Sequence, residues 1–139
     1  MNRLQPAKWP RPRGYAHGIV STGRVVFVSG QIGWDAAGRF AASDIAGQTR
    51  QALSNIVAIL AEAGALPEHV ARLTWFITDK GAYLDARGAI GTAYREVMGR
   101  HFPAMSVVVV AGLLESAACV EIEATAVIPP AHAGASIGR

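Results

Sequence analysis

Cysteine, charge and long apolar runs are all scarce in this 139-residue chain. Its single cysteine, Cys119, excludes a disulfide scaffold. No stretch approaches the roughly 18 uncharged apolar residues that a membrane-spanning helix needs, so no membrane partner is expected. Only 17% of the residues are charged and 51% are apolar, the reverse of the balance in a disordered chain. The sequence therefore predicts one compact domain, part of whose apolar surface is buried between subunits.

The sequence also lacks the motifs that identify several enzyme classes. It has no HExxH or CxxC pair and its four histidines are widely separated, so no metal site is expected. It has no GxSxG, no GxxxxGK[ST] and no GxGxxG. These absences argue against an α/β-hydrolase, an NTPase and a dinucleotide-binding oxidoreductase.

The net charge of +3 comes from the start of the chain. Five of the 13 cations precede the first acidic residue, Asp35, and the rest of the chain is slightly acidic. No lysine or arginine run and no aromatic-rich basic motif is present, so nucleic-acid binding is not expected. We expect a basic, proline-containing leader over 1–14, a folded domain over 15–129 and a flexible tail over 130–139. Without an apolar export core, the expected location is the cytoplasm.

The apolar pattern predicts the element order ββαβαββ. β-Branched residues around Gly23 predict a hairpin over 19–29. Apolar residues at spacings of three and four predict a helix over 43–63, with Ser43 as its N-cap and Gly64 at its end. The remaining expected elements are a strand over 70–78, a second helix over about 82–100, and strands over 104–111 and 119–128. Two helices on one face of a mixed sheet make an α+β domain.

The last expected strand carries two carboxylates on one face. Glu121 and Glu123 are two residues apart, so they lie opposite the apolar face of Val120 and Ile122. One interpretation is a solvated strand face. In the other, one glutamate lines a cleft and holds a water or moves a proton, since a partly buried carboxylate has a tunable pKa. Spacing alone leaves both interpretations open.

Three further features are candidates for ligand contact. The Ser-Gly-Gln segment over 29–31 ends a strand at a glycine, which lets a backbone approach a ligand closely. An ordinary strand-ending turn would have the same sequence. Tyr15 could offer its phenol to a pocket or pack over a sheet edge. Trp34 and Trp75 are expected to anchor the core or an interface.

Four stretches spaced along the chain carry a family resemblance. They are Phe27-Val-Ser29-Gly-Gln-Ile32, the helical stretch Gln48-Thr-Arg-Gln-Ala-Leu-Ser-Asn55 continuing to Ala63-Gly64, Phe102-Pro-Ala-Met-Ser106 and Val120-Glu-Ile-Glu-Ala124. Together they resemble the Rid family, also called YjgF/YER057c/UK114, over about residues 15–129. The resemblance implies a chorismate-mutase-like subunit in a homotrimer, with the sheets around a central barrel and small-molecule clefts between subunits. Deaminating members hydrolyse reactive enamines and imines, such as 2-aminoacrylate, to a 2-keto acid and ammonia without metal or organic cofactor.

The resemblance also assigns roles to particular residues. It implies that Glu121 holds the attacking water, and that Tyr15, Ser29 and the backbone near Val107 orient the substrate. Val107 stands where the deaminating members have a cysteine. Those members also bind the substrate carboxylate with an arginine in a Pro-Ala-Arg-Ser motif, in two parallel hydrogen bonds. Here Met105 stands in its place, and a thioether offers neither charge nor donor.

The missing arginine leaves several functions open. The first is a divergent Rid enzyme that hydrolyses an enamine or imine other than a simple 2-imino acid, with Trp34 as a candidate wall of a more apolar pocket. Another cation, such as Arg100 or one from a neighbouring subunit, could take over the clamp. The second is a small-molecule-binding or protein-protective trimer without turnover, favoured by Met105 and by Gly91, which stands where the family has an asparagine. An endoribonuclease or translation-inhibitor activity ranks last, because the chain lacks a histidine pair and a basic groove.

Overall fold

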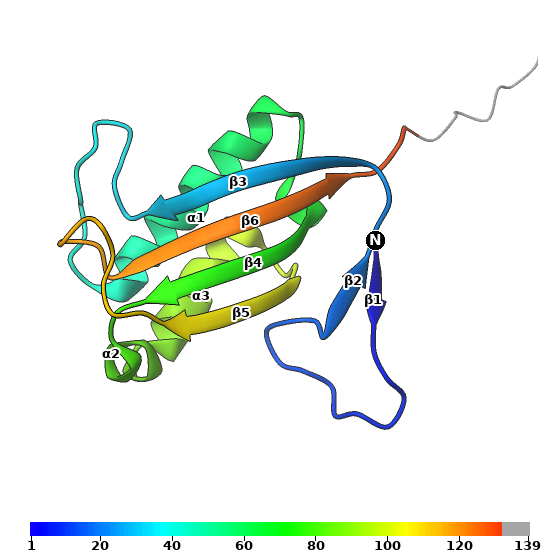
Figure 1. Ribbon diagram of the computed structural model, residues 1–139, viewed down its shortest axis with the longest axis horizontal. Helices are drawn as coiled ribbons and strands as arrows, with labels where there is room; N and C mark the ends of the chain where they lie inside the picture. Colours follow the sequence, from blue (N-terminus) through cyan, green and yellow to red (C-terminus); the bar gives the residue numbers. More distant parts are fainter. Residues whose placement is uncertain (132–139) are drawn as a thin grey trace, which may run out of the picture.

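A four-stranded mixed sheet forms the centre of the protein, whose computed structural model describes residues 1–131. The strands are β3 (Arg24–Ile32), β6 (Val120–Ile128), β4 (Val70–Ile77) and β5 (Ala104–Val109), in that spatial order (Figure 1). β6 is antiparallel to both of its neighbours, whereas β4 and β5 are parallel. The expected α+β fold is therefore confirmed. From residue 132 on, the expected tail lies outside the described residues.

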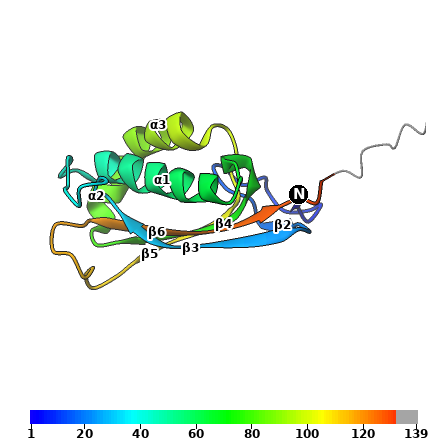
Figure 2. The ribbon, with the colours of Figure 1, turned by 90° about the horizontal axis from the view of Figure 1, so that it is seen from above.

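Helix α1 (Ile45–Glu62) lies along one face of this sheet (Figure 2). Its N-cap is one residue later than predicted, because the Asp44 carboxylate, and not Ser43, accepts a backbone N–H of the first turn at 3.0 Å. Gly64 follows the last turn with a φ of 71°, as the predicted helix end requires. The buried stripe consists of Ile45, Gln48, Thr49, Ala52, Leu53, Ile56 and Leu60.

The segment expected as one helix over about 82–100 forms two. α2 (Lys80–Asp85) and α3 (Arg87–Met98) meet at Ala86, and α3 packs beside α1 on the same face of the sheet (Figure 2). Arg87, the first residue of α3, donates from its guanidinium Nε to the Leu84 carbonyl at 3.0 Å. This bond satisfies a carbonyl that the break leaves free. No helix among the described residues is long and apolar enough to cross a membrane.

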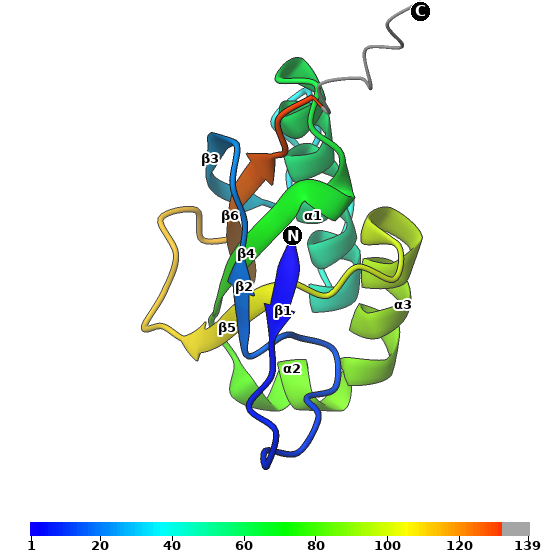
Figure 3. The same cartoon turned by 90° about the vertical axis from the view of Figure 1, so that its right-hand side faces the viewer.

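The N-terminal residues form a separate two-stranded sheet, so the hairpin expected over 19–29 is wrong. β2 (Gly18–Val20) pairs with β1 (Asn2–Leu4) and not with β3, and this small sheet lies beyond the end of the main one (Figures 1 and 3). Gly23, the expected hairpin turn, has a φ of 149°, and a Cβ there would be 1.9 Å from the Ile128 carbonyl oxygen. The glycine therefore lets the chain pass close to the end of β6.

The other face of the main sheet has no helix over it (Figure 2). Large apolar side chains are exposed there: Phe27 is 80% exposed and Val25 is 51% exposed. β5 forms one edge of the sheet, with Val107 and Val109 exposed by 37% and 54%. Within residues 1–131, the outer side of this edge meets only a single bridge between Ala16 and Ala104. An open apolar edge of this kind favours pairing with another chain.

Candidate functional site

Glu121 is half-buried against a glycine of the neighbouring strand. β3 is irregular between Val28 and Gln31, and its Gly30 lies against the Glu121 carboxyl group. A Cβ at position 30 would lie 2.7 Å from the Glu121 Cδ and Oε2 atoms, so any larger residue would have to displace the carboxylate. β3 continues through this segment to Ile32, so the strand end expected at 29–31 is wrong, and the group that lies close to Gly30 is a carboxylate of the protein.

The second carboxylate of β6 lies in a different environment. Glu123 is exposed, in a shallow hollow of about 270 Å³ with Arg72 and Thr74. The solvated-face interpretation fits Glu123, whereas the confined position of Glu121 favours the functional one. In residues 1–131, no three His, Cys, Asp or Glu side chains form a group that could hold a metal ion.

Ser29 is exposed next to the glycine that accommodates Glu121. The Gln31 side chain donates from Nε2 to the Ser29 carbonyl at 3.1 Å and to its hydroxyl oxygen at 3.3 Å. The hydroxyl oxygen therefore accepts a bond and keeps its own proton for another partner. We call Ser29, Gly30 and Glu121 the glutamate cluster.

A buried glutamine that sequence analysis missed fixes the start of β6. Gln48 is fully buried, and its Nε2 donates to the carbonyls of Ala42 at 3.1 Å and Ala117 at 2.9 Å. Its Oε1 accepts the Cys119 N–H at 2.9 Å and the thiol at 3.1 Å. β6 is thus anchored to α1 two residues before Glu121. The available signal was a polar residue on the apolar stripe of a helix.

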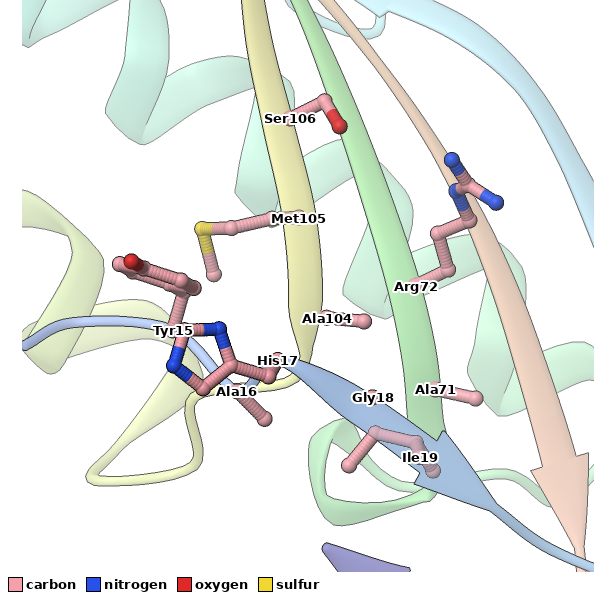
Figure 4. A pocket seen from close by; sticks show the side chains of 10 residues that line it. All are labelled: Tyr15, Ala16, His17, Gly18, Ile19, Ala71, Arg72, Ala104, Met105 and Ser106. Atoms are coloured by element: carbon pink, nitrogen blue, oxygen red, sulfur yellow. The ribbon is translucent and has the colours of Figure 1, made fainter. Parts of the chain in front are cut away.

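Tyr15 and Met105 lie together at the other edge of the sheet, around a hollow of about 410 Å³ (Figure 4). The segment before β2 brings Tyr15 there, because the Ala16 N–H donates to the Pro103 carbonyl at 3.0 Å, just before β5. The Tyr15 ring meets the His17 ring edge-on, with the centroids 5.6 Å apart. The structure thus brings together two of the residues that the sequence singled out.

Met105 also borders a second hollow, on the side of the sheet that the helices cover. Met105 pairs in register with Leu73 of β4, which is fully buried under the helices, so the Met105 side chain points to the helix-covered face. This hollow, of about 320 Å³, also contains Arg87 and Arg95 of α3. Arg72, on the opposite face, borders the first hollow. Arg100, the expected substitute for the missing arginine, lines neither hollow.

Val107 and Trp34 lie away from both hollows. Val107 is on the exposed edge of β5. Trp34 lies beside α1, where Asn55 donates to its carbonyl at 2.9 Å and the Phe40 ring lies 6.2 Å away between centroids. Within one subunit, therefore, Trp34 does not border the hollows that contain Met105, and its role as a cleft wall stays a prediction.

The candidate residues form two groups that lie far apart in one subunit. The glutamate cluster is on β3 and β6, whereas Tyr15 and Met105 lie at β5, with β4 between β6 and β5. Neighbouring strands are about 4.8 Å apart, so β6 and β5 are about 10 Å apart. Glu121 also points to the uncovered face and Met105 to the covered one. One small molecule cannot contact both residues in the same subunit.

A mixed sheet with both helices on one face, and a carboxylate confined over a glycine of the neighbouring strand, define a small α+β protein. The family model described as Endoribonuclease L-PSP matches residues 8–128. The chain belongs to this family, the Rid or YjgF/YER057c/UK114 family, and the resemblance stated from the motifs is confirmed.

Curated relatives match most of the chain. A RutC family protein of Pyrococcus abyssi is 34% identical over 120 residues, covering 86% of this chain and 91% of that protein. The 2-iminobutanoate/2-iminopropanoate deaminase of Capra hircus is 32% identical over 128 residues, covering 91% and 90%.

Solved structures agree with these relatives. A Rid-family protein of unknown function from Yersinia pestis, YyfB, superposes with a TM-score of 0.80 at 31% identity, covering 91% of this chain and 98% of that one. E. coli TdcF with bound serine has a TM-score of 0.65 at 33% identity, covering 92% of this chain and 99% of that one. The comparisons thus support the fold and the family.

Proposed function

We propose that this protein hydrolyses a reactive enamine or imine to a carbonyl compound and ammonia, in clefts between the subunits of a homotrimer. The observation that carries the proposal is the Glu121 carboxylate, confined over Gly30, the residue that follows Ser29 in the chain. Relatives named 2-iminobutanoate/2-iminopropanoate deaminase support it, as does the TdcF structure with bound serine, a small amino acid.

In the proposed reaction, Glu121 acts as a general base and then as a general acid. A water oxygen bonds to the C=N carbon while the carboxylate takes one of its protons, and the π electrons move to nitrogen. The nitrogen is protonated and leaves as ammonia, while the hydroxyl on carbon loses its proton and becomes the carbonyl. An enamine first takes a proton on carbon and loses one from nitrogen, which gives the imine. Ser29 and Tyr15 orient the substrate by hydrogen bonds.

A homotrimer supplies the proximity that one subunit lacks. The glutamate cluster and Met105 are separated by about 10 Å across the sheet and lie on opposite faces. Two subunits meeting at sheet edges can bring one glutamate cluster beside the Tyr15 and Met105 of a neighbour. The exposed edge of β5 and the exposed Phe27 on the uncovered face support such an interface.

Met105 restricts the substrate class. In a desolvated site, losing a paired charged contact costs several kcal/mol of binding. The Met105 side chain lies partly buried against the core and offers no hydrogen-bond donor to a substrate carboxylate. We therefore propose that the substrate is not a simple 2-imino acid with a small side chain, such as 2-iminopropanoate.

Binding of a small molecule without turnover is the second candidate function. It is favoured by the same Met105 and by Gly91, which has no side chain to contact a ligand. The two functions differ in one measurable quantity, the release of ammonia from an imine.

The experiment that tests the enzymatic proposal compares two carboxylates of one strand. An amino-acid oxidase generates imines from a panel of L-amino acids, and the rate of their hydrolysis is measured. Glu121→Gln is expected to lower turnover by roughly 10²-fold or more, the usual effect of losing a positioned acid or base. Glu123→Gln, its matched control, is expected to have little effect. Equal, small effects would return both residues to the solvated-face interpretation.

A further inference from the structure

The hollow between α3 and the edge of the sheet contains an aromatic stack. The hollow has a volume of about 320 Å³ and lies on the helix-covered side of Met105. Trp75 stacks on Tyr94 with the ring centroids 6.3 Å apart, and Tyr94 stacks on Phe102 at 5.2 Å. Mainly apolar walls with a few polar groups, at this volume, are typical of a small-molecule site.

Two arginines of α3 form the polar end of this hollow. The Arg95 guanidinium lies over Gly91, one turn earlier, where an added Cβ would be 3.2 Å from its Nη1. Arg87 bonds to the Leu84 carbonyl through Nε, at 3.0 Å. Among residues 1–131, neither arginine belongs to an ion pair. Their terminal N–H groups can therefore bind an anion, and a carboxylate is the anion that a guanidinium fits best in geometry.

A buried donor without a partner lies in the wall of the same hollow. Trp75 is 3% exposed, and its indole N–H has no acceptor among the described residues. Buried donors in folded proteins nearly always have a partner. The Trp75 ring also lines the hollow, so the signal of its N–H would report a ligand bound there.

We infer that this hollow binds a small carboxylic acid with an apolar, ring-sized body. Arg87 and Arg95 hold the carboxylate, and the body packs against the aromatic stack and Met105. The two arginines of α3 then supply the positive charge that Met105 lacks. On one point the inference rests on the proposed function: the acid is the imine substrate or its keto product. The substrate class is then imines with a large apolar side chain.

The test uses phenylpyruvate, a keto acid with one ring, and NMR of the three tryptophan indole N–H groups, with the Trp75 signal identified from Trp75→Phe. We expect phenylpyruvate to shift the Trp75 signal. Phenylacetamide, which lacks the charge, and pyruvate, which lacks the ring, are expected to bind at least about tenfold more weakly. Arg87→Gln and Arg95→Gln should each raise the Kd of phenylpyruvate about tenfold or more. Arg39→Gln, which removes an exposed charge elsewhere, should leave the Kd unchanged.

A glycine variant separates ligand binding from folding. Gly91→Ala improves helix propensity and should raise the Tm, yet its Cβ, 3.2 Å from the Arg95 Nη1, would make the guanidinium shift slightly, so we expect phenylpyruvate binding to weaken. The inference is overturned if the Trp75 signal does not move, if phenylacetamide binds as tightly as phenylpyruvate, or if the folded arginine variants keep the original affinity.

The inference and the proposed function fail in different ways. Phenylpyruvate binding in a protein that releases no ammonia from any imine would support this inference and remove the enzymatic proposal. Imine turnover that depends on Glu121, in a protein that does not bind phenylpyruvate, would support the enzymatic proposal and overturn this inference.

Discussion

The contact between Gly30 and Glu121 predicts a strong effect from a single added methyl group. In Gly30→Ala the Cβ would lie 2.7 Å from the Glu121 carboxyl carbon, so the carboxylate must move. We expect turnover to fall by roughly 10²-fold, as for loss of the carboxylate itself, measured as kcat/KM on any imine the protein hydrolyses.

The control for this prediction is a glycine with free space around it. An added Cβ at Gly88 of α3 meets no atom within 4 Å. Gly88→Ala is expected to raise the free energy of unfolding by about 0.5–1 kcal/mol without changing turnover. Unchanged kcat/KM in Gly30→Ala would mean that Glu121 has no role in the reaction.

Met105 predicts the response of the protein to small 2-imino acids. The unmodified protein is expected to hydrolyse 2-aminoacrylate and 2-iminopropanoate weakly or not at all, because no charged donor stands at position 105 and these small acids have no ring to pack on the aromatic stack. Met105→Arg is expected to raise this activity by about tenfold or more, and Met105→Gln, which adds a donor without charge, much less. Activity of the unmodified protein on these small acids equal to that of an arginine-bearing family member would contradict the prediction, because neither an arginine at position 105 nor a ring would then be needed for binding.

At the scale of elements, the start of α1 offers a test between two neighbouring caps. Asp44→Ala removes the carboxylate that accepts a first-turn N–H, so the free energy of unfolding should fall by about 1 kcal/mol. Ser43→Ala removes no such bond and should change it by less than about 0.5 kcal/mol. Chemical denaturation measures both values. A larger effect at Ser43 would restore it as the cap.

The N-terminal strands show where local pattern stops being informative. The residues of β2 have the composition of a strand, and they do form one, but their partner is β1 at the start of the chain. Alternation indicates that a segment is extended, whereas pairing depends on which edge is available when the chain is folded. The α2–α3 break has the same origin, since a helical pattern continues across Ala86.

At the scale of the whole molecule, the uncovered sheet face predicts assembly. Sedimentation equilibrium should give about three times the 14.6 kDa mass of the chain. Phe27→Glu places a charge at a side chain that is 80% exposed on this face and should shift the mass towards that of the monomer. Leu66→Glu, at a 53% exposed position before the short 3₁₀ helix η1 (Pro67–His69), should leave the trimer intact. A monomer at micromolar concentration would remove the intersubunit cleft.

The sequence by itself determined the fold class, the family and most of the elements. These depend on local periodicity and on short motifs, which are properties of neighbours along the chain. Glu121 and Glu123 illustrate the limit, because spacing puts both on one face and only the contact with Gly30 distinguishes them. The partner of β2, the role of Gln48 and the position of Arg87 and Arg95 beside Met105 were decided by tertiary structure. Each depends on contacts between segments far apart in the chain, which no local pattern specifies.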